Sequence, residues 1–521
     1  MTKTFPPIYG TIRTMNRLMT FCAACASFAA AAGTVTYEEF GAVGDGKTDD
    51  RNAIIAAHEA ANARGVPVRA KDGATYYIGC VGRSATIKTD VDFGTAKFIL
   101  DDTKVPGKYI TVPAFNIMPD AAPIPVTGIG PLAKGQKSLG VKLPGGCLVR
   151  LENSGVKRFI RYGKNQNNGS PQQEMVIVDG DGRIDPSTPL VWDYEKVTSA
   201  KAWPIDGRTI TVKGGSFTTI ANQAESRYTY YLRGFCVRRS NVRIEGLSNY
   251  VTGELDHGAP YSGFLRILEC ANVTVTGCVF TAHRTYETIG SAGLPVSMGT
   301  YGIGVGSAVN VSFIGCRQTT DILDNRYWGL FGSNYCRNLL FDNCEFSRFD
   351  AHMGVANATI RNSTLGHQGV QAIGFGTLLI ENTTVRSSGS MVGLRSDYGS
   401  SWDGDIVIRN CKYAPIPGRR PEMSPLISGS NLGTHDYGYG CTMPRRIVID
   451  GLEIDDSGWT GEKGETYIFA PFDRRCKGDG VRPYPVPEEV TLRNVHTVSG
   501  RPLKTSRNMA MFGKVKIVQA E

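Results

Sequence analysis

An all-β solenoid, the right-handed parallel β-helix with a helix capping its N-terminal end, is the fold class that this 521-residue sequence predicts. Three observations predict it. A nine-residue phrase recurs from about residue 209, its copies are spaced by about the length of one solenoid coil, and a short helical segment lies near the N-terminus.

The recurring phrase has the pattern of a strand that ends in a sharp turn. A polar residue opens it, apolar residues take the second and fourth places, Gly or Asn takes the sixth, and a small residue takes the seventh. Alternating apolar residues indicate a strand, and Gly or Asn at a fixed place indicates a bend. Clear copies begin at Asn272, Asn310, Asn338, Asn357, Thr377 and Asp405.

The spacing between copies decides the architecture. Asn310 to Asn338 is 28 residues and Asn338 to Asn357 is 19. Short strands at such intervals, without helical periodicity between them, are typical of a parallel β-helix, and the pattern of the rival leucine-rich repeat is absent. We therefore predict one β-helix domain with loop insertions at residues 35–500 and a C-terminal tail at residues 501–521.

The N-terminal helix is predicted at residues 49–63. Thr48 or Asp49 is placed to cap its start, and Gly65 to end it. A helix in this position would cover the end of the solenoid, where a hydrophobic core would otherwise be exposed.

Several cysteines fit the same alignment. They are expected to be buried, reduced and stacked in neighbouring coils as a ladder of small residues, rather than to form disulfides or a zinc site. Those in the seventh place are Cys278, Cys316, Cys344 and Cys411, and those two residues before the phrase are Cys270 and Cys336.

Residues 1–32 have the pattern of an export signal. Arg13 and Arg17 precede a short apolar run that ends in small residues, and Met15 is an alternative initiator. No later apolar run is long enough to span a bilayer. The mature protein is therefore expected to be secreted, periplasmic or at the cell surface.

The excess of basic residues indicates which kind of partner the protein binds. Lys and Arg number 57 against 48 Asp and Glu, a formal net charge of +9 that is spread along the chain. This excess favours an acidic partner, whereas the absence of a basic block and of RNA-binding aromatic motifs argues against nucleic acid.

One motif carries a resemblance to a known family. The run Phe40-Gly-Ala-Val-Gly-Asp-Gly-Lys-Thr-Asp-Asp50, followed by Asn52-Ala-Ile54, resembles the opening of the pectate-lyase-like β-helix superfamily. Polysaccharide lyases, glycoside hydrolases and phage tailspikes share that opening. The resemblance implies the β-helix fold and a polysaccharide ligand, and it leaves the reaction open.

A second register predicts a ligand groove. Five segments read x-apolar-Gly-apolar, and their glycines are expected to point outward and form a low floor. The segments are Gly302–Val305, Tyr327–Leu330, His352–Val355, Ala372–Phe375 and Met391–Leu394. Tyr327 and His352 are expected to rise from this floor in one register, with Asn325, Arg326, Asp350 and Arg395 nearby.

The histidines form a second cluster. The chain has only 7, yet four of them fall in neighbouring or near-neighbouring coils: His257, His283, His352 and His367. Arg284 and Tyr286 lie close to His283 in the sequence. A single histidine is as often structural as catalytic, but the cluster favours a functional site.

A polysaccharide lyase is the first interpretation of these residues. A lyase removes the proton next to a uronate carboxylate, and needs a base, an acid and a group that neutralises the carboxylate. The predicted catalytic residues are His352 as base, Tyr327 as acid and Arg326 as neutraliser, with His283 as an alternative base. The predicted substrate-binding residues are Asn325, Arg284, Tyr286, Asp350, His367, Arg395 and His257.

Two alternatives stay open. A β-helix glycoside hydrolase would use paired carboxylates, and Asp321, Asp350 and Gly366-His367-Gln368-Gly369 partly match polygalacturonase motifs. A noncatalytic, tailspike-like glycan-binding β-helix is the other. No cofactor or metal site is predicted, because calcium prefers several oxygen ligands and no dense acidic cluster is present.

Overall fold

The computed structural model describes residues 33–79, 82–224, 230–255, 258–416, 423–458, 464–473 and 475–519. Residues 34–521 form one compact unit. The predicted export signal at residues 1–32 and the predicted site residue His257 lie outside the described residues. Among the residues described, no helix is long and apolar enough to cross a membrane.

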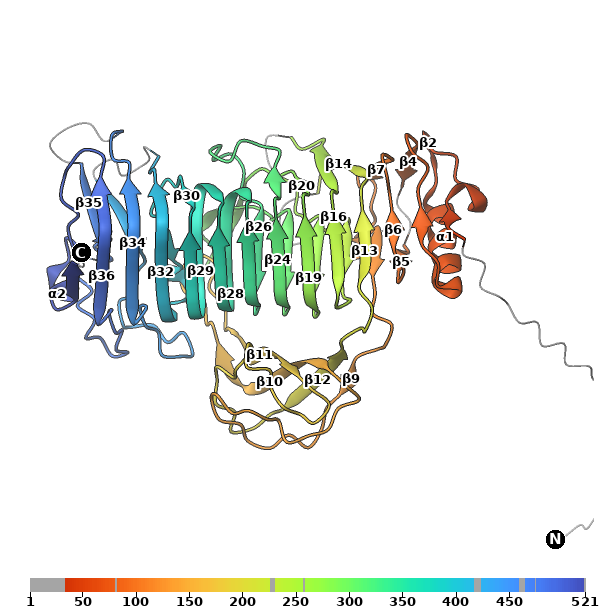
Figure 1. Ribbon diagram of the computed structural model, residues 1–521. Helices are drawn as coiled ribbons and strands as arrows, with labels where there is room; N and C mark the ends of the chain where they lie inside the picture. Colours follow the sequence, from red (N-terminus) through yellow and green to blue (C-terminus); the bar gives the residue numbers. More distant parts are fainter. Residues whose placement is uncertain are drawn as a thin grey trace, which may run out of the picture. The chain divides into compact units, whose positions relative to one another are not determined.

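The unit is a right-handed parallel β-helix, as predicted (Figure 1). Its strands pair in parallel with those of the neighbouring coils and form three faces, which the chain follows in the order first, second, third. The first face contains β1 (Val35–Thr36), β3 (Val68–Arg69), β6 (Val91–Asp92), β13 (Ile210–Lys213), β16 (Val242–Glu245), β19 (Ala271–Thr276), β24 (Val309–Ile314), β27 (Arg337–Asp342) and β37 (Lys516–Gln519).

The other two faces repeat this arrangement. The second contains β2 (Asp45–Asp49), β4 (Thr75–Ile78), β7 (Lys97–Asp101), β14 (Ser216–Ile220), β17 (Ser248–Thr252), β20 (Val279–Phe280), β25 (Arg317–Gln318) and β30 (Thr384–Val385). The third contains β5 (Ala85–Ile87), β8 (Phe115–Ile117), β15 (Phe235–Val237), β18 (Leu265–Leu268), β23 (Ile303–Gly306), β26 (Phe331–Asn334), β31 (Val392–Leu394), β33 (Met423–Ser428) and β35 (Glu465–Phe469).

Five long strands turn from one face into the next. β28 (Glu345–Arg361) and β29 (Thr364–Glu381) contribute to all three faces. β32 (Trp402–Tyr413), β34 (Arg446–Ile454) and β36 (Glu489–Thr497) continue from the first face into the second. Because β36 also pairs with β37, the parallel ladder extends beyond residue 500, where we had predicted a tail.

The nine-residue phrase forms the first face and its turn into the second. Its opening asparagines have positive φ and bond to one another along the stack: Asn338 Nδ2 donates to Asn310 Oδ1 (2.9 Å), and Asn310 Nδ2 donates to Asn272 Oδ1 (3.0 Å). The sixth place also has positive φ, for example at Gly277 and Asn343. Gly and Asn adopt this backbone conformation most readily, which explains their fixed place in the repeat.

The cysteine ladder is present. All the described cysteines are free thiols and buried. Cys316 Sγ lies 3.4 Å from Val275 O of the preceding coil, and Cys344 Sγ lies 3.3 Å from Phe313 O. Burial raises the pKa of the Cys336 thiol to about 12, so that thiol stays protonated.

Each end of the stack carries a helix (Figure 1). At the N-terminal end, α1 (Arg51–Arg64) packs Ile54, Ile55 and His58 into the core and ends at Gly65, as predicted. Its start is two residues later than expected, and the Asp50 carboxylate accepts hydrogen bonds from the backbone of the 43–44 turn rather than capping the helix.

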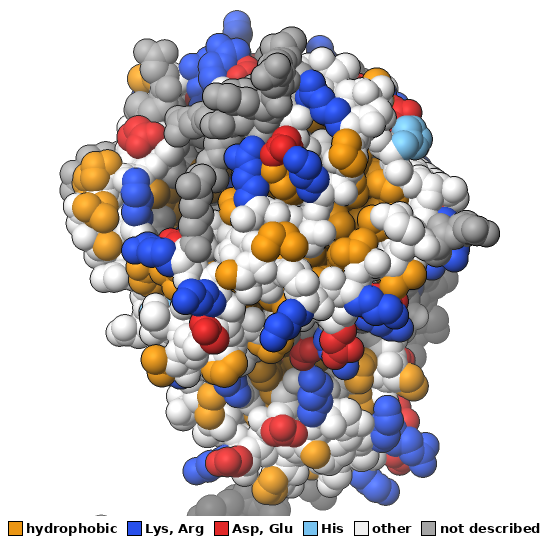
Figure 2. All heavy atoms as spheres, turned by 90° about the vertical axis from the view of Figure 1, so that its left-hand side faces the viewer, with side chains coloured by type: hydrophobic (Ala, Val, Ile, Leu, Met, Phe, Trp, Pro, Cys, Tyr) orange, Lys and Arg blue, Asp and Glu red, His pale blue; other side chains and the backbone are white. Residues whose placement is uncertain are grey.

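At the C-terminal end, the short helix α2 (Met509–Phe512) covers the last coil, and Phe512 is fully buried. Seen end-on in Figure 2, this side of the molecule shows hydrophobic side chains interspersed with charged ones rather than one continuous apolar face. Turns within the described residues contain the short 3-10 helices η1 (Glu38–Phe40), η2 (Gly107–Tyr109) and η3 (Ser396–Tyr398).

Among the described residues, two insertions that contain strands of their own leave the solenoid. Between β8 and β13 the chain forms an antiparallel sheet with its own hydrophobic core, which lies below the stack in Figure 1. Its strands are β9 (Ile124–Pro125), β10 (Cys147–Arg158), β11 (Ser170–Val178) and β12 (Ser199–Pro204). The hairpin of β21 (Tyr286–Ile289) and β22 (Pro295–Met298) leaves between the second and third faces.

Candidate functional site

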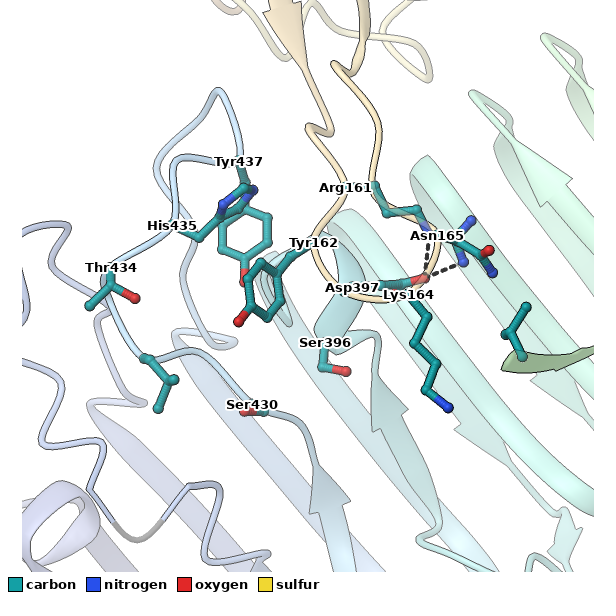
Figure 3. A pocket seen from close by; sticks show the side chains of 13 residues that line it. Arg161, Tyr162, Lys164, Asn165, Ser396, Asp397, Ser430, Thr434, His435 and Tyr437 are labelled. Carbon is teal, nitrogen blue, oxygen red and sulfur yellow. Dashed lines mark hydrogen bonds and ion pairs between the residues drawn. The ribbon is translucent and has the colours of Figure 1, made fainter. Parts of the chain in front are cut away.

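A pocket lies on the third face, beneath a loop of the inserted sheet. It encloses about 390 Å³, and we call it the roofed pocket (Figure 3). Its lining residues are Arg161, Tyr162, Gly163, Lys164, Asn165, Val296, Ser396, Asp397, Ser430, Leu432, Thr434, His435 and Tyr437.

The roof is the loop at residues 159–169, between β10 and β11. Tyr162 N–H donates to Asp397 O (2.9 Å), and Ala292 N–H donates to Lys164 O (3.1 Å). The loop therefore contacts both the turn after β31 and the β21–β22 hairpin. The inserted sheet and the turn after β31 both leave the solenoid between the third and first faces, which is why the pocket combines the two.

A chain of ion pairs fixes the roof to the solenoid. Arg161 binds Asp397 at 2.8 Å, Asp397 binds Arg395 at 2.9 Å, and Arg395 binds Asp350 at 3.0 Å. Burial opposes ionisation of Asp350, but Arg348 and Arg395 outweigh it and hold its pKa at about 2. Asp350 is fully buried and also accepts a hydrogen bond from Tyr301, so it is a structural anchor rather than a free carboxylate.

The pocket brings together groups capable of proton transfer. His435 Nε2 lies 3.2 Å from Ile160 O; because a carbonyl only accepts, Nε2 carries a proton, and the lone pair of the neutral ring is on Nδ1. The His435 ring lies 5.2 Å from the ring of Tyr162 and 4.6 Å from that of Tyr437. Burial raises the pKa of Tyr437, so its phenol remains a donor.

Cations accompany these groups. Lys164 is exposed and donates one hydrogen bond to Pro295 O at 2.8 Å. Tyr162 and Lys164 extend from the same loop toward the side of the pocket where Ser396 and Ser430 lie (Figure 3). Asp397 is the one carboxylate among the lining residues, and it is bound by two arginines.

His352 lies next to this network but does not line the pocket. It is the extra residue of a β-bulge in β28, because Ser333 pairs with Ala351 and Asn334 pairs with Met353. Its Nδ1 lies 2.7 Å from Asn334 Oδ1. Burial, and then the charge of Arg395, lower the pKa of His352 to about 3, so the imidazole is neutral at neutral pH and a weak base.

The predicted common register of Tyr327 and His352 is wrong. Gly304 pairs with Gly332, not with Gly329, so Tyr327 lies in the loop before β26 and outside the strand. The prediction assumed that Tyr327 and His352 occupy the same place in adjacent coils. That assumption fails because the loop before β26 and the bulge at His352 change the number of residues in each coil.

The predicted glycine floor is covered by side chains of neighbouring coils. A Cβ on Gly304 would meet the Arg266 guanidinium, and a Cβ on Gly332, which pairs with Gly304 in place of the predicted Gly329, would meet the Tyr301 ring. Gly393 lies beneath the Gln371 amide. These glycines thus make room for large side chains on the third face.

The remaining predicted residues lie along the border between the second and third faces. We call this region the upstream wall; it consists of His283, Arg284, Tyr286, Asn325, Arg326, Tyr327 and His367. His283 is buried, its Nδ1 lies 2.6 Å from Glu254 Oε1, and its ring stacks on Tyr261 at 4.8 Å. Tyr286 is also buried.

The rest of the wall is equally engaged in local contacts. Arg284 and Tyr327 form an isolated antiparallel bridge, which joins the two wall segments. Arg326 is exposed but folds back onto Asp324 at 2.6 Å. His367 is buried, and burial lowers its pKa. Asn325 is exposed in the same loop as Arg326.

The sequence grouped Arg395 and Asp350 with His352 beside a glycine floor, and it did not indicate the residues that line the roofed pocket. Tyr162, Lys164 and His435 fall outside the repeated phrases, in a segment without a solenoid pattern and in a long gap between copies. The long gaps between copies of the phrase could have indicated these residues, because such gaps are loops in a solenoid and loops commonly carry functional residues. In the described part of the chain, no three His, Cys, Asp or Glu side chains converge as a metal site would require.

Comparison with known proteins supports the fold. No family model matches the sequence, and no curated protein matches it. The tailspike gp54 of Acinetobacter baumannii bacteriophage AP22, solved with a capsular saccharide, matches with a TM-score of 0.51 at 11% identity, over 93% of this chain and 79% of that one. The tailspike gp49 of Pseudomonas phage LKA1 matches with a TM-score of 0.50 at 13% identity, over 93% and 84%.

These likenesses establish the class of fold. The chain has the right-handed parallel β-helix fold that its N-terminal motif and its repeats predicted. At such low identities the likeness concerns the fold alone, and the chemistry has to be argued from this chain's own residues.

Proposed function

We propose that the protein binds an acidic polysaccharide in the roofed pocket and cleaves it by β-elimination. One observation carries the proposal: the lining combines His435, Tyr162, Arg161 and Lys164, while its single carboxylate, Asp397, is already bound by two arginines. The tailspike of phage AP22, which has the same fold, was solved with a capsular saccharide, and this adds support for a polysaccharide ligand. An extracellular location, expected from the N-terminal sequence, belongs to the same proposal.

In the proposed reaction, separate residues neutralise the carboxylate, accept the proton and donate a proton to the leaving group. Lys164 neutralises the uronate carboxylate and makes the adjacent C5 proton acidic. His435 accepts that proton at Nδ1, the ring nitrogen that does not bond to Ile160 O. The C4–O bond breaks as the C4–C5 double bond forms, and Tyr162 donates its phenolic proton to the departing oxygen. No step requires a cofactor.

A hydrolase receives less support from this geometry. It would need two carboxylates on opposite sides of the scissile bond. Asp350 is fully buried in its ion pairs, and Asp321 does not line the pocket.

The upstream wall, together with His352, is the other location at which the same chemistry can be proposed. His352, Tyr327 and Arg326 were the residues that the sequence favoured. The roofed pocket is preferred because its acid–base groups surround a cavity, whereas Arg326 is paired with Asp324 and His352 is a weak base.

Product analysis tests the proposal. The protein is incubated with pectic, alginate and glycosaminoglycan polymers, while ultraviolet absorbance and new reducing ends are followed together. We expect both signals to rise at equal rates on at least one polymer, because β-elimination creates one unsaturated uronate per cut. Reducing ends without absorbance would indicate hydrolysis, and binding without either signal would indicate a noncatalytic module; both results would contradict the proposal.

A further inference from the structure

A second depression adjoins the roofed pocket on the third face. It has a volume of about 490 Å³, shares Ser396, Asp397 and Ser430 with the pocket, and extends across the strands toward β35. We call it the trough. Its other lining residues are Gln371, Gly393, Leu394, Arg395, Ser428, Gly429, Ala470, Pro471 and Phe472.

The trough follows the axis of the solenoid. Gln371 pairs with Gly393, and Gly393 pairs with Ser428, so the three residues form one row across successive coils. Adjacent coils are about 4.8 Å apart, which is comparable to the length of one sugar ring. A polymer with one unit in the roofed pocket can therefore place its next units in the trough.

The trough and the roofed pocket differ in charge. The charged lining residues of the trough are Arg395 and Asp397. They bind each other at 2.9 Å, and their second partners are Asp350 at 3.0 Å and Arg161 at 2.8 Å. Each charge is thus compensated within the protein, whereas the roofed pocket also holds Lys164, which is exposed and donates a hydrogen bond to the backbone carbonyl of Pro295.

The floor of the trough consists of groups that suit sugar hydroxyls. Gln371 Nε2 donates to Gln368 O at 3.0 Å, which holds the amide across Gly393. A Cβ on Gly393 would lie only 2.7 Å from Gln371 Oε1, so glycine is required for this placement. Amide and hydroxyl groups with fixed positions are the usual means of recognising neutral sugars by hydrogen bonds.

An aromatic ring completes the site. Phe472 has φ of 54°, a backbone conformation that is unfavourable for a phenylalanine, and it is only partly buried. A Cβ on Gly429 would lie 3.0 Å from the Phe472 ring, so this glycine too makes room for the ring. Phe472 packs against Phe512 and lines the end of the trough, where it adds an apolar group to the lining.

We propose that the trough binds an uncharged sugar unit next to the acidic unit held in the roofed pocket. The inference rests on the proposed function and specifies its substrate class: a heteropolysaccharide in which acidic and neutral sugars are adjacent, rather than a polymer of uronate alone.

Binding without cleavage tests this inference. In a His435→Ala background, affinities are measured for hyaluronan and unsulfated chondroitin, which alternate uronate with a neutral amino sugar, and for polygalacturonate and alginate, which are uronate throughout. We expect at least about tenfold tighter binding of an alternating polymer. Gln371→Ala and Gly393→Ala should remove that preference and leave the weaker binding of the uronate polymers unchanged.

The matched control is Gln519→Ala, at an exposed glutamine on the last strand, with folding of each variant checked by circular dichroism. Equal or tighter binding of the uronate polymers, or a preference that both trough variants retain, would overturn the inference. A tenfold preference in a wild-type protein that never forms an unsaturated product would leave this inference standing and refute the proposed cleavage.

Discussion

The roofed pocket and the upstream wall both contain histidine, tyrosine and basic side chains, but the pocket arranges them around a cavity. In the wall, His283 is held by Glu254 and stacked on Tyr261, and Arg326 is held by Asp324. In the pocket, His435 and Lys164 line a cavity of about 390 Å³. Residue type alone therefore does not define a site, because the cavity depends on a loop from the inserted sheet.

The largest expected effect is the loss of catalytic rate when a histidine of the roofed pocket is replaced. His435→Ala should lower kcat by about two to four orders of magnitude, the usual contribution of general acid–base catalysis. The control is His496→Ala, at a histidine that is 64% exposed on β36, and it should retain wild-type activity. Initial rates of product absorbance give the measurement. Full activity of the His435 variant would place the base elsewhere, with His283 and His352 the next candidates.

The next effect concerns the ion pairs beneath the pocket. Asp350→Asn should lower the free energy of unfolding by about 3–5 kcal/mol, because it leaves Arg348 and Arg395 without their buried partner. Asp479→Asn, at an exposed aspartate, is the control and should change stability little. Denaturant unfolding followed by fluorescence gives the comparison. Equal midpoints for the two variants would mean that the network does not anchor the pocket.

A smaller effect should appear in the pH dependence of stability. The pKa of His352 is about 3 in the folded protein, below its unfolded value of about 6.5. The unfolded chain therefore binds the proton first, and stability should fall as pH decreases from about 6.5 toward 3. Asp350, with a folded pKa of about 2, adds a loss in the same direction below about pH 4.

Thermal unfolding midpoints measured across this range test the effect. The slope between pH 6.5 and 4 should be shallower in His352→Gln, because glutamine does not titrate, and unchanged in His496→Gln. An identical slope in wild type and His352→Gln would show that His352 is not kept neutral by its surroundings.

The two regions also show what could be predicted from the sequence. Strand positions, turns and the cysteine ladder follow from a repeat in which each place has one environment, as the stacked asparagines at 310 and 338 demonstrate. The helix at residues 51–64 was predictable from local end signals, although the predicted start at residue 49 is two residues too early. These features depend on residues that are close together in the sequence, so they can be predicted from one sequence.

The pocket depends on contacts between segments far apart in the chain, which no local pattern reports. Arg161 and Asp397 are 236 residues apart, and His435 bonds to a carbonyl 275 residues away. The bulge at His352 and the loop before β26 also shifted the count of residues per coil, so the alignment brought Tyr327 and His352 into a false register. Of the five glycines of the predicted floor, Gly304 and Gly393 lie on strands of the third face, whereas Gly329 lies in the loop before β26.

The most direct test of the account compares one cation from each region. Affinity for an acidic polysaccharide is measured for Lys164→Ala, in the roofed pocket, and for Arg284→Ala, in the upstream wall, with the exposed Lys196→Ala as a control for net charge. The account predicts about tenfold weaker binding for Lys164→Ala, and for Arg284→Ala only the small change that Lys196→Ala also shows. Weakened binding in Arg284→Ala, with Lys164→Ala no different from the control, would contradict it and place the ligand on the wall.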